Sequence, residues 1–388
     1  MYSSPFSYST KGGFSRALAS PNKAQSPLRS NRISPYSKDR FVSPAKSPSR
    51  SPLREGTNSI VDTSANKRQS TPTTPKNRRA PIAEDNILDA PDVQKSLPVK
   101  LIDFNKNGDL AIALGTSIYI WSQGQVTELM NGGTQFDAVS WCDEGLIISG
   151  NGNIELWDVR QQVAFFAFQN HERRCSAISA SGSMAATGGA DGITRITDTR
   201  SGDFQELKLH PKCGEISSLA WSYDGRYLAA GANHVVGVFK SKQPQLYEAS
   251  GKVQSLSWTQ GDILYAADYD QGNVQMIRAT MNSVLNQVDT GSPISGLCYT
   301  DSWGLVTASA VTGDWSIYTP RELKLISDYH GHSDGIINIT ACEERNLVAT
   351  IGLDETLRIW TLKEPRGPLN SPSVVRRPPS PFGNFGIR

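Results

Sequence analysis

The chain has 388 residues, of which 38% are apolar and 20% charged, with 39 Lys and Arg against 37 Asp and Glu. This length allows two or three domains, or one large all-β domain with a tail. No stretch approaches 18 consecutive apolar residues, so no transmembrane helix is predicted. The first residues lack the continuous apolar segment of a secretory signal.

The first 80 residues differ in composition from the rest. They carry fifteen Lys or Arg against three acidic residues, a local charge of +12, while the other 308 residues carry −10. They also hold 17 Ser and 9 of the 22 Pro, and none of the Trp or Cys. Such a segment cannot bury enough apolar surface to offset its chain entropy. We expect residues 1–80 to be a disordered, basic regulatory tail. Its few aromatic residues do not favour nucleic-acid binding.

The remainder is an array of repeats. A short strand that ends in a large or β-branched residue recurs seven times, with its last residue 36 to 42 positions after the previous one. Alternating residues and Gly, Asn or Asp turns about every ten positions predict short antiparallel strands. A period near 40 resembles the WD repeat of β-propellers. The sequence therefore predicts an all-β, seven-bladed WD-repeat β-propeller over residues 81–363, followed by a flexible tether over 364–388. The seven recurring segments are Ile118–Trp121, Ile154–Trp157, Thr194–Thr197, Val236–Phe239, Val274–Ile277, Trp315–Tyr318 and Leu357–Trp360.

Conspicuous polar residues in the repeats have a structural interpretation. In WD repeats a His, a Ser or Thr, a turn Asp and a Trp commonly share a buried hydrogen-bond network, and His332, Thr350, Asp354 and Trp360 fit that pattern. The five cysteines lack metal-ligand spacing, so we interpret them as buried thiols in a reducing compartment. No catalytic or phosphate-binding motif is present. We expect a recognition surface without cofactor or metal, and not an enzyme.

Four features in a fixed order carry a more specific resemblance. Residues 86–93, Asn-Ile-Leu-Asp-Ala-Pro-Asp-Val, precede the first repeat, and Asp354–Trp360 reads Asp-Glu-Thr-Leu-Arg-Ile-Trp. The chain ends in Gly386-Ile387-Arg388, and the basic tail contains Asp39-Arg40-Phe41-Val42-Ser43-Pro44. Together these features resemble the fizzy and fizzy-related family, the WD-repeat coactivators that bring substrates to the anaphase-promoting complex.

The resemblance implies roles for particular residues. Substrates of the family carry a destruction box, Arg-x-x-Leu. Leu88, Asp89 and Glu355 match the positions that bind it, with carboxylates for the Arg and an apolar side chain for the Leu. Docking to the complex is implied for the C-box-like and C-terminal residues, although Ser43 stands where the family has Pro. These docking residues are Asp39, Arg40, Phe41, Val42, Ile387 and Arg388.

The resemblance fails at the positions that bind a second degron, the KEN box. The usual Arg of the last blade is Gly335, an aromatic is replaced near Leu97-Pro98, and an Asn pair is reduced to Asn233 with His234. We therefore predict a destruction-box-binding activator with weak or absent KEN recognition. A stage-specific member, for example in meiosis rather than mitosis, is one consequence.

The basic tail contains four matches to the Ser-Pro-x-Arg/Lys preference of cyclin-dependent kinases. Each phosphate adds about −1.5 to −2 charges, so about seven phosphates would cancel the charge of the tail. We expect such a kinase to modify the protein and to weaken its docking. The four sites are Ser26, Ser43, Ser47 and Ser51.

The leading hypothesis is thus a substrate adaptor and activator of a ubiquitin ligase in cell division. Its expected partners are subunits of the anaphase-promoting complex and destruction-box substrates such as cyclins, in the nucleus and cytoplasm. No membrane or nucleic-acid partner is expected. The alternative is a general WD-repeat scaffold in another assembly without coupling to a ubiquitin ligase.

Overall fold

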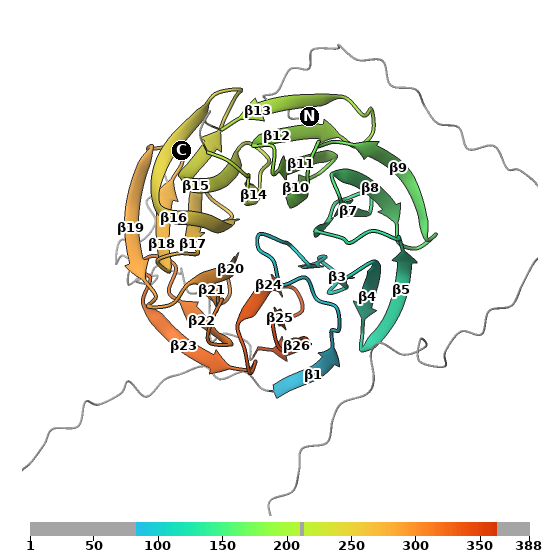
Figure 1. The fold of residues 1–388 in the computed structure, drawn as a ribbon. Helices are drawn as coiled ribbons and strands as arrows, with labels where there is room; N and C mark the ends of the chain where they lie inside the picture. Colours follow the sequence, from blue (N-terminus) through green and yellow to red (C-terminus); the bar gives the residue numbers. More distant parts are fainter. Residues whose placement is uncertain (1–82, 210–212, 363–388) are drawn as a thin grey trace, which may run out of the picture.

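The computed structural model describes residues 83–209 and 213–362, and the regular elements in these ranges are all β-strands. The strands form antiparallel sheets arranged as a ring around a central axis (Figure 1). In each four-stranded sheet the strand at one end lies near the axis and the strand at the other end forms the outer rim. The predicted all-β propeller is therefore confirmed. Residues 1–80 and 364–388, with the C-box-like segment, the Ser-Pro sites and the Ile-Arg ending, lie outside the described residues.

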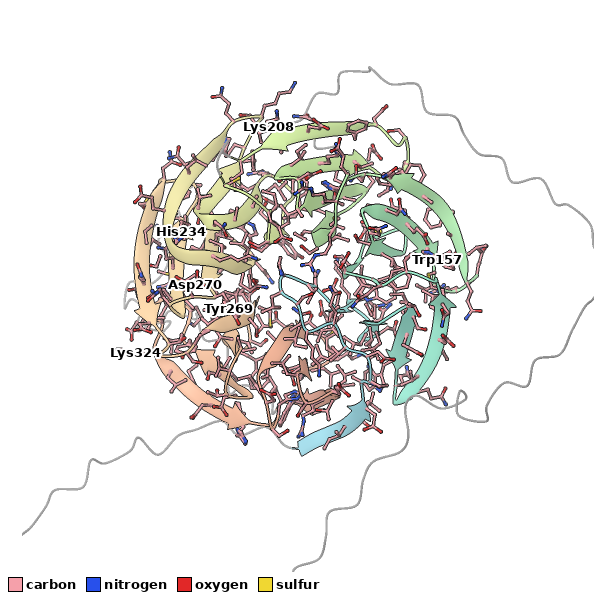
Figure 2. The ribbon with its side chains drawn as sticks, viewed as in Figure 1. Trp157, Lys208, His234, Tyr269, Asp270 and Lys324 are labelled. Carbon is pink, nitrogen blue, oxygen red and sulfur yellow. The ribbon has the colours of Figure 1, made fainter. Side chains whose placement is uncertain are left out.

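Four of the sheets consist of four strands in chain order. Short turns join neighbouring strands, and β-branched and large apolar residues fill the strand interiors, as favoured in half-buried sheets. Figure 2 shows Lys208 on a rim strand of one such sheet. The strands are β2 (Ile102–Phe104), β3 (Leu110–Leu114), β4 (Ser117–Ser122) and β5 (Gln125–Asn131); β6 (Ala138–Trp141), β7 (Leu146–Gly150), β8 (Asn153–Asp158) and β9 (Val163–Gln169); β10 (Cys175–Ser181), β11 (Met184–Gly189), β12 (Ile193–Asp198) and β13 (Phe204–Lys208); and β20 (Ile294–Thr300), β21 (Gly304–Ser309), β22 (Asp314–Tyr318) and β23 (Leu325–His330).

The prediction of seven separate blades is wrong as a count of hydrogen-bonded sheets, because the described residues form six. A six-stranded sheet lies where two four-stranded blades were expected. All seven recurring segments nevertheless fall on strands. The sheet contains β14 (Ser218–Trp221), β15 (Leu228–Phe239), β16 (Pro244–Trp258), β17 (Ile263–Asp268), β18 (Asn273–Arg278) and β19 (Ser283–Asp289).

Two long strands cause this merger, because each takes two partners along its length. The first part of β15 pairs with β14, and its second part, after His234, pairs with the first part of β16. The second part of β16 pairs with β17. The two parts of each long strand follow one another with almost no connecting residues. In β15 the change of partner occurs at His234, which has a φ of 55°. In β16 it occurs near Lys252, whose backbone N–H donates to Asp270 at 2.7 Å. Figure 2 shows His234, Tyr269 and Asp270 in this arc.

The ring closes by pairing segments from opposite ends of the described chain. The closing sheet has the order β1 (Ala83–Asp89), β26 (Thr356–Thr361), β25 (Leu347–Gly352) and β24 (Ile336–Cys342). β1 runs antiparallel to β26, with Leu88 opposite Leu357 and Asp89 opposite Thr356. Because β1 is supplied from outside the repeat order, the last sheet gains its outer strand and the ring has no open end.

The apolar core is distributed between neighbouring sheets. Six buried clusters follow the ring, and the largest joins the first sheet to the closing sheet. Inner strands are also joined by side chains: Ser179 Oγ accepts the N–H of Trp221, and Ser257 Oγ accepts that of Tyr299, each at 3.0 Å. These bonds link residues 42 apart, which matches the repeat length. They surround a channel of about 540 Å³.

The predicted network around His332 is confirmed. The Trp360 Nε1–H donates to Thr350 Oγ1 at 3.1 Å, Thr350 Oγ1 lies 2.8 Å from His332 Nε2, and His332 Nδ1 lies 2.9 Å from Asp354 Oδ1. A neutral imidazole satisfies the whole chain, with Nδ1–H donating to the carboxylate and Nε2 accepting from the hydroxyl. The residues are buried, so their role is structural.

A second network was not predicted from the sequence. His171 lies 3.1 Å from Asp191 Oδ2 and 3.0 Å from Thr187 Oγ1, although this repeat ends in Thr197 instead of Trp. The missing Trp N–H is replaced by Asn170, whose Nδ2 donates to Thr187. The two positions are sterically coupled, because the Trp ring leaves no room for a side chain at the residue before the His. A Cβ at Gly331, the residue equivalent to Asn170, would lie 2.4 Å from the Trp360 ring.

We predict that Gly331→Ala lowers the free energy of unfolding by about 1–3 kcal/mol, because the added methyl group collides with the Trp360 ring. Thermal or urea unfolding of the purified chain measures this change. Gly261→Ala is the matched control, since its Cβ would meet nothing closer than Thr259 Oγ1 at 3.6 Å. Equal stability of the two variants would contradict the steric coupling.

Candidate functional site

The structure brings together the three residues predicted to bind a peptide at the closing sheet. Leu88 and Asp89 end β1, and the turn that leads into β26 contains Glu355. The Ala90 N–H donates to the Glu355 carbonyl at 2.7 Å, so the backbones are fixed side by side. Residues 266 positions apart thus meet on one edge of the ring, held by strand pairing rather than by loop contacts.

The local chain geometry presents these side chains at the surface. Glu355 has a φ of 59°, a left-handed conformation at the turn between β25 and β26. Asp89 is exposed, and Leu88 is half-buried against the largest core cluster. Leu88 therefore both packs and offers part of its side chain to the surface. The two interpretations of this residue, packing and binding, are compatible.

Sequence reasoning missed a cation at this edge. Lys95 Nζ lies 3.0 Å from Glu355 Oε1, and both side chains are about half exposed, at 54% and 50%. Pairs of this kind contribute at most about 1 kcal/mol, so an incoming guanidinium can replace Lys95. The pairing shows that the Glu355 carboxylate is placed to accept a cation. No sequence signal links two residues 260 positions apart.

The positions where the resemblance implied a second peptide site have a different structure. A Cβ at Gly335 would lie 1.9 Å from the Ala310 carbonyl oxygen, so no larger residue fits there. The Leu97-Pro98 peptide is cis, and Arg174 Nη2 donates to the Pro98 carbonyl at 2.6 Å. His234 Nδ1 lies 3.2 Å from the Ser250 carbonyl, to which it donates a hydrogen bond.

Arg174 also begins a chain of opposite charges on this face. Its guanidinium lies 3.9 Å from Asp137 and 3.7 Å from Glu215, and Lys252 Nζ lies 3.5 Å from Glu215. Burial raises the pKa of Asp137 against the opposing effects of the Gln94 hydrogen bond and Arg174. These charged groups are paired with one another across three sheets. They hold the segment after β1, named here the strap (residues 91–100), over the ring.

The cysteines and histidines show no arrangement for metal or nucleophilic chemistry within the described residues. All five cysteines are free; Cys175, Cys213 and Cys342 are buried, whereas Cys142 and Cys298 are only half-buried, which corrects the expectation that all are buried. Burial raises the pKa of Cys142 to about 11 and that of Cys175 to about 12. No cluster of three His, Cys, Asp or Glu with metal-binding geometry occurs in residues 83–209 and 213–362. No helix in those ranges is long and apolar enough to span a membrane.

Comparisons with known proteins agree with the fold. The WD domain, G-beta repeat, matches residues 204–240. The chain is 27% identical over 305 residues to the B-type cell cycle switch protein ccs52A of Medicago truncatula, covering 74% of this chain and 64% of that protein. It is 26% identical over 302 residues to Protein FIZZY-RELATED 3 of Arabidopsis thaliana, covering 74% and 63%.

A further relative carries the same family name. Meiotic fizzy-related protein 1 of Schizosaccharomyces pombe is 26% identical over 316 residues, covering 76% of this chain and 74% of that protein. The chain is a divergent relative of the Fizzy-related proteins. The resemblance predicted from the sequence is therefore confirmed. The match spans less than two thirds of the length of the Medicago and Arabidopsis relatives.

A solved structure shares the fold. One chain in the crystal structure of the mitotic checkpoint complex matches with a TM-score of 0.69 at 22% identity, covering 79% of this chain and 99% of that chain. At this identity the likeness shows a common propeller architecture. Residue roles therefore depend on the geometry described above.

The buried His171 network predicts a dependence of stability on pH. Burial lowers the pKa of His171 below its ordinary 6.5, against the opposing effect of Asp191. The unfolded chain therefore binds the proton first, so the free energy of unfolding falls as pH drops below about 6.5 and is retained above it. Urea unfolding between pH 7.5 and 5.5 measures this slope.

His171→Gln is expected to reduce the slope, because it removes the titrating group. Asn170→Ala is the matched control, since it weakens the same network but keeps His171 and should keep the slope. An unchanged slope in His171→Gln would show that other groups control the pH dependence.

Proposed function

We propose that the chain is a substrate-recognition adaptor that activates the anaphase-promoting complex. The observation that carries this proposal is the closing seam, the edge where β1 meets β26, which brings Leu88, Asp89 and Glu355 together. Two carboxylates beside a partly exposed aliphatic side chain match an Arg-x-x-Leu peptide in charge and polarity. The relatives named as cell cycle switch and fizzy-related proteins support the same class of role.

The chemistry of this role is binding without covalent change. A substrate arginine would replace Lys95 at Glu355 and share Asp89, and its leucine would contact Leu88. The site lies on strand ends of the ring, so it is held in place before the peptide arrives, which limits the entropy lost on binding. The propeller thus acts as an adaptor, and ubiquitin transfer is carried out by the partner enzyme.

We propose in addition that the KEN degron is bound weakly or not at all. The steric limit at Gly335 leaves no room for the arginine expected there. Arg174 takes a different position and holds the strap through Pro98. The charged groups nearby are already paired within the chain.

A fluorescent destruction-box peptide tests both proposals by anisotropy with the full chain. Asp89→Asn and Glu355→Gln should each weaken binding by about tenfold, since a charge-assisted hydrogen bond contributes about 1.5–3 kcal/mol. Lys95→Gln is the matched control and should leave affinity equal or raise it, because Lys95 competes for Glu355. A KEN peptide should bind far more weakly.

Two results would contradict these proposals. If the wild-type chain, Asp89→Asn and Glu355→Gln bound the destruction-box peptide with equal affinity, the closing seam would not be the binding site. Equal affinity for the KEN and destruction-box peptides would end the proposal of lost KEN recognition.

Docking onto the complex is proposed to use Arg40 in the C-box-like segment and the Ile387-Arg388 ending, with phosphorylation of the Ser-Pro sites weakening it. Two weak contacts on one chain would bind by avidity, so losing either should strongly reduce capture. Capture of the anaphase-promoting complex from extract, with Arg40→Ala and with Ile387-Arg388 deleted, measures this. Absence of capture by the dephosphorylated full chain would favour the alternative, a WD-repeat scaffold in another assembly.

A further inference from the structure

A groove of about 1040 Å³ lies on the face of the ring opposite the strap. Turns of four consecutive sheets line it, through residues 103–107, 109, 141–145, 158–160, 180–182 and 221–223. The groove meets the central channel at Tyr223, which lines both cavities and is 72% exposed. It is therefore a continuous open surface that leads from the rim to the axis.

The combined surface is acidic. Eight acidic and three basic side chains line the groove and the channel. Arg200 pairs with Glu144 Oε1 at the rim at 3.1 Å, so this carboxylate is already partly neutralised within the chain. Asp143 is exposed beside it. The acidic side chains are Asp103, Asp109, Asp143, Glu144, Asp158, Asp301, Glu343 and Glu344, and the basic ones are Lys100, Lys106 and Arg160.

The exposed Asp143 carboxylate and the exposed Tyr223 ring favour a cationic ligand. Carboxylates accept charge-assisted hydrogen bonds from Lys and Arg. A tyrosine face attracts the same cations through its ring electrons. An open groove with this lining suits an extended basic chain segment better than a small compact molecule.

The strand register places the start of the described chain on this same face. Ala83 pairs with Thr361, which pairs with Leu347 beside the turn between β24 and β25. In that turn, Arg345 Nε donates to the Asn107 carbonyl at 3.0 Å, and Asn107 lines the groove. The described chain therefore begins at the rim on the same face as the groove.

We propose that the basic segment 1–80 binds this groove in the same molecule, with its Lys and Arg side chains against the acidic lining and Tyr223. The segment carries +12 and the rest of the chain −10, so the charges are complementary. Ten extended residues span about 35 Å, which is enough to cross the face. Covalent attachment gives the segment an effective concentration of about millimolar, so weak contacts suffice.

The proposal assigns a regulatory consequence to the Ser-Pro sites. Each added phosphate contributes about −1.5 to −2 charges, which offsets part of the positive charge of the segment, and it is repelled by the groove carboxylates. Phosphorylation then releases the segment from the ring. This mechanism does not depend on the proposed degron site, because the groove and the closing seam have no residue in common.

Carbodiimide crosslinking of the full chain, which couples lysine amines to carboxylates, tests the proposal at low protein concentration. Mass spectrometry should find crosslinks from Lys38 or Lys46 to Asp143, Glu144 or Asp158, which all line the groove. The crosslinks to Asp158, a carboxylate that stays in place, should be lost in the double variant Asp143→Asn, Glu144→Gln, after treatment with a cyclin-dependent kinase, and in high salt, which screens exposed charges. Glu172→Gln, an exposed acid in the β9–β10 connection on the other face, should leave them unchanged.

Three results would overturn the proposal. The first is no crosslink between the segment and the groove in the unphosphorylated chain. The second is an equal spread of crosslinks over both faces that the groove variant does not change. The third is crosslinks only between isotopically distinct copies in a mixture, which would make the contact intermolecular. Matching unfolding temperatures of the variants confirm that the ring is intact.

Discussion

The architecture depends on the antiparallel pairing of β1 with β26. Hydrogen bonds within each sheet run from the axis toward the rim, and they do not hold one sheet to the next. Cohesion around the ring comes from apolar packing between sheets and from side-chain bonds between inner strands. A ring built this way can separate at one seam unless its last sheet is completed by the other end of the chain. β1 provides that outer strand, and Leu88 adds apolar contact with the largest core cluster.

This closure also creates the features to which function is assigned. Asp89 and Glu355 become neighbours only because Leu88 pairs with Leu357. The same register fixes Ala83 beside Thr361, and thereby fixes the face on which the described chain begins. The edge proposed for recognition and the position at which the described chain begins are thus consequences of one strand pairing. Its loss would remove both together.

The two faces of the ring differ in their electrostatics. On one face, Arg174, Glu215 and Lys252 are paired with one another and hold the strap in place. On the other, acidic turn residues outnumber basic ones and surround the exposed Tyr223. Paired charges satisfy each other and leave little to offer a ligand, whereas an excess of one sign requires counter-charge from elsewhere. The groove face is therefore the one that favours an additional charged ligand.

The sequence alone determined the local pattern. The period near 40, the alternation of residues and the glycine turns specified strands at all seven recurring segments, because strand formation depends on neighbouring residues. It also determined the His332 network, whose members lie within a single repeat, and the residues of the closing seam through a family resemblance. The second network escaped notice because Asn170 performs the role of a missing Trp, a substitution with no local signature.

Only the tertiary structure decided the contacts between residues far apart in the chain. The merger of two expected blades into one sheet depends on how β15 and β16 continue through connections too short to separate them. The pairing of Lys95 with Glu355 and the bond from Arg174 to Pro98 join different segments of the ring. Such pairs have no fixed spacing in sequence, because their distance is set by closure of the ring and not by the repeat.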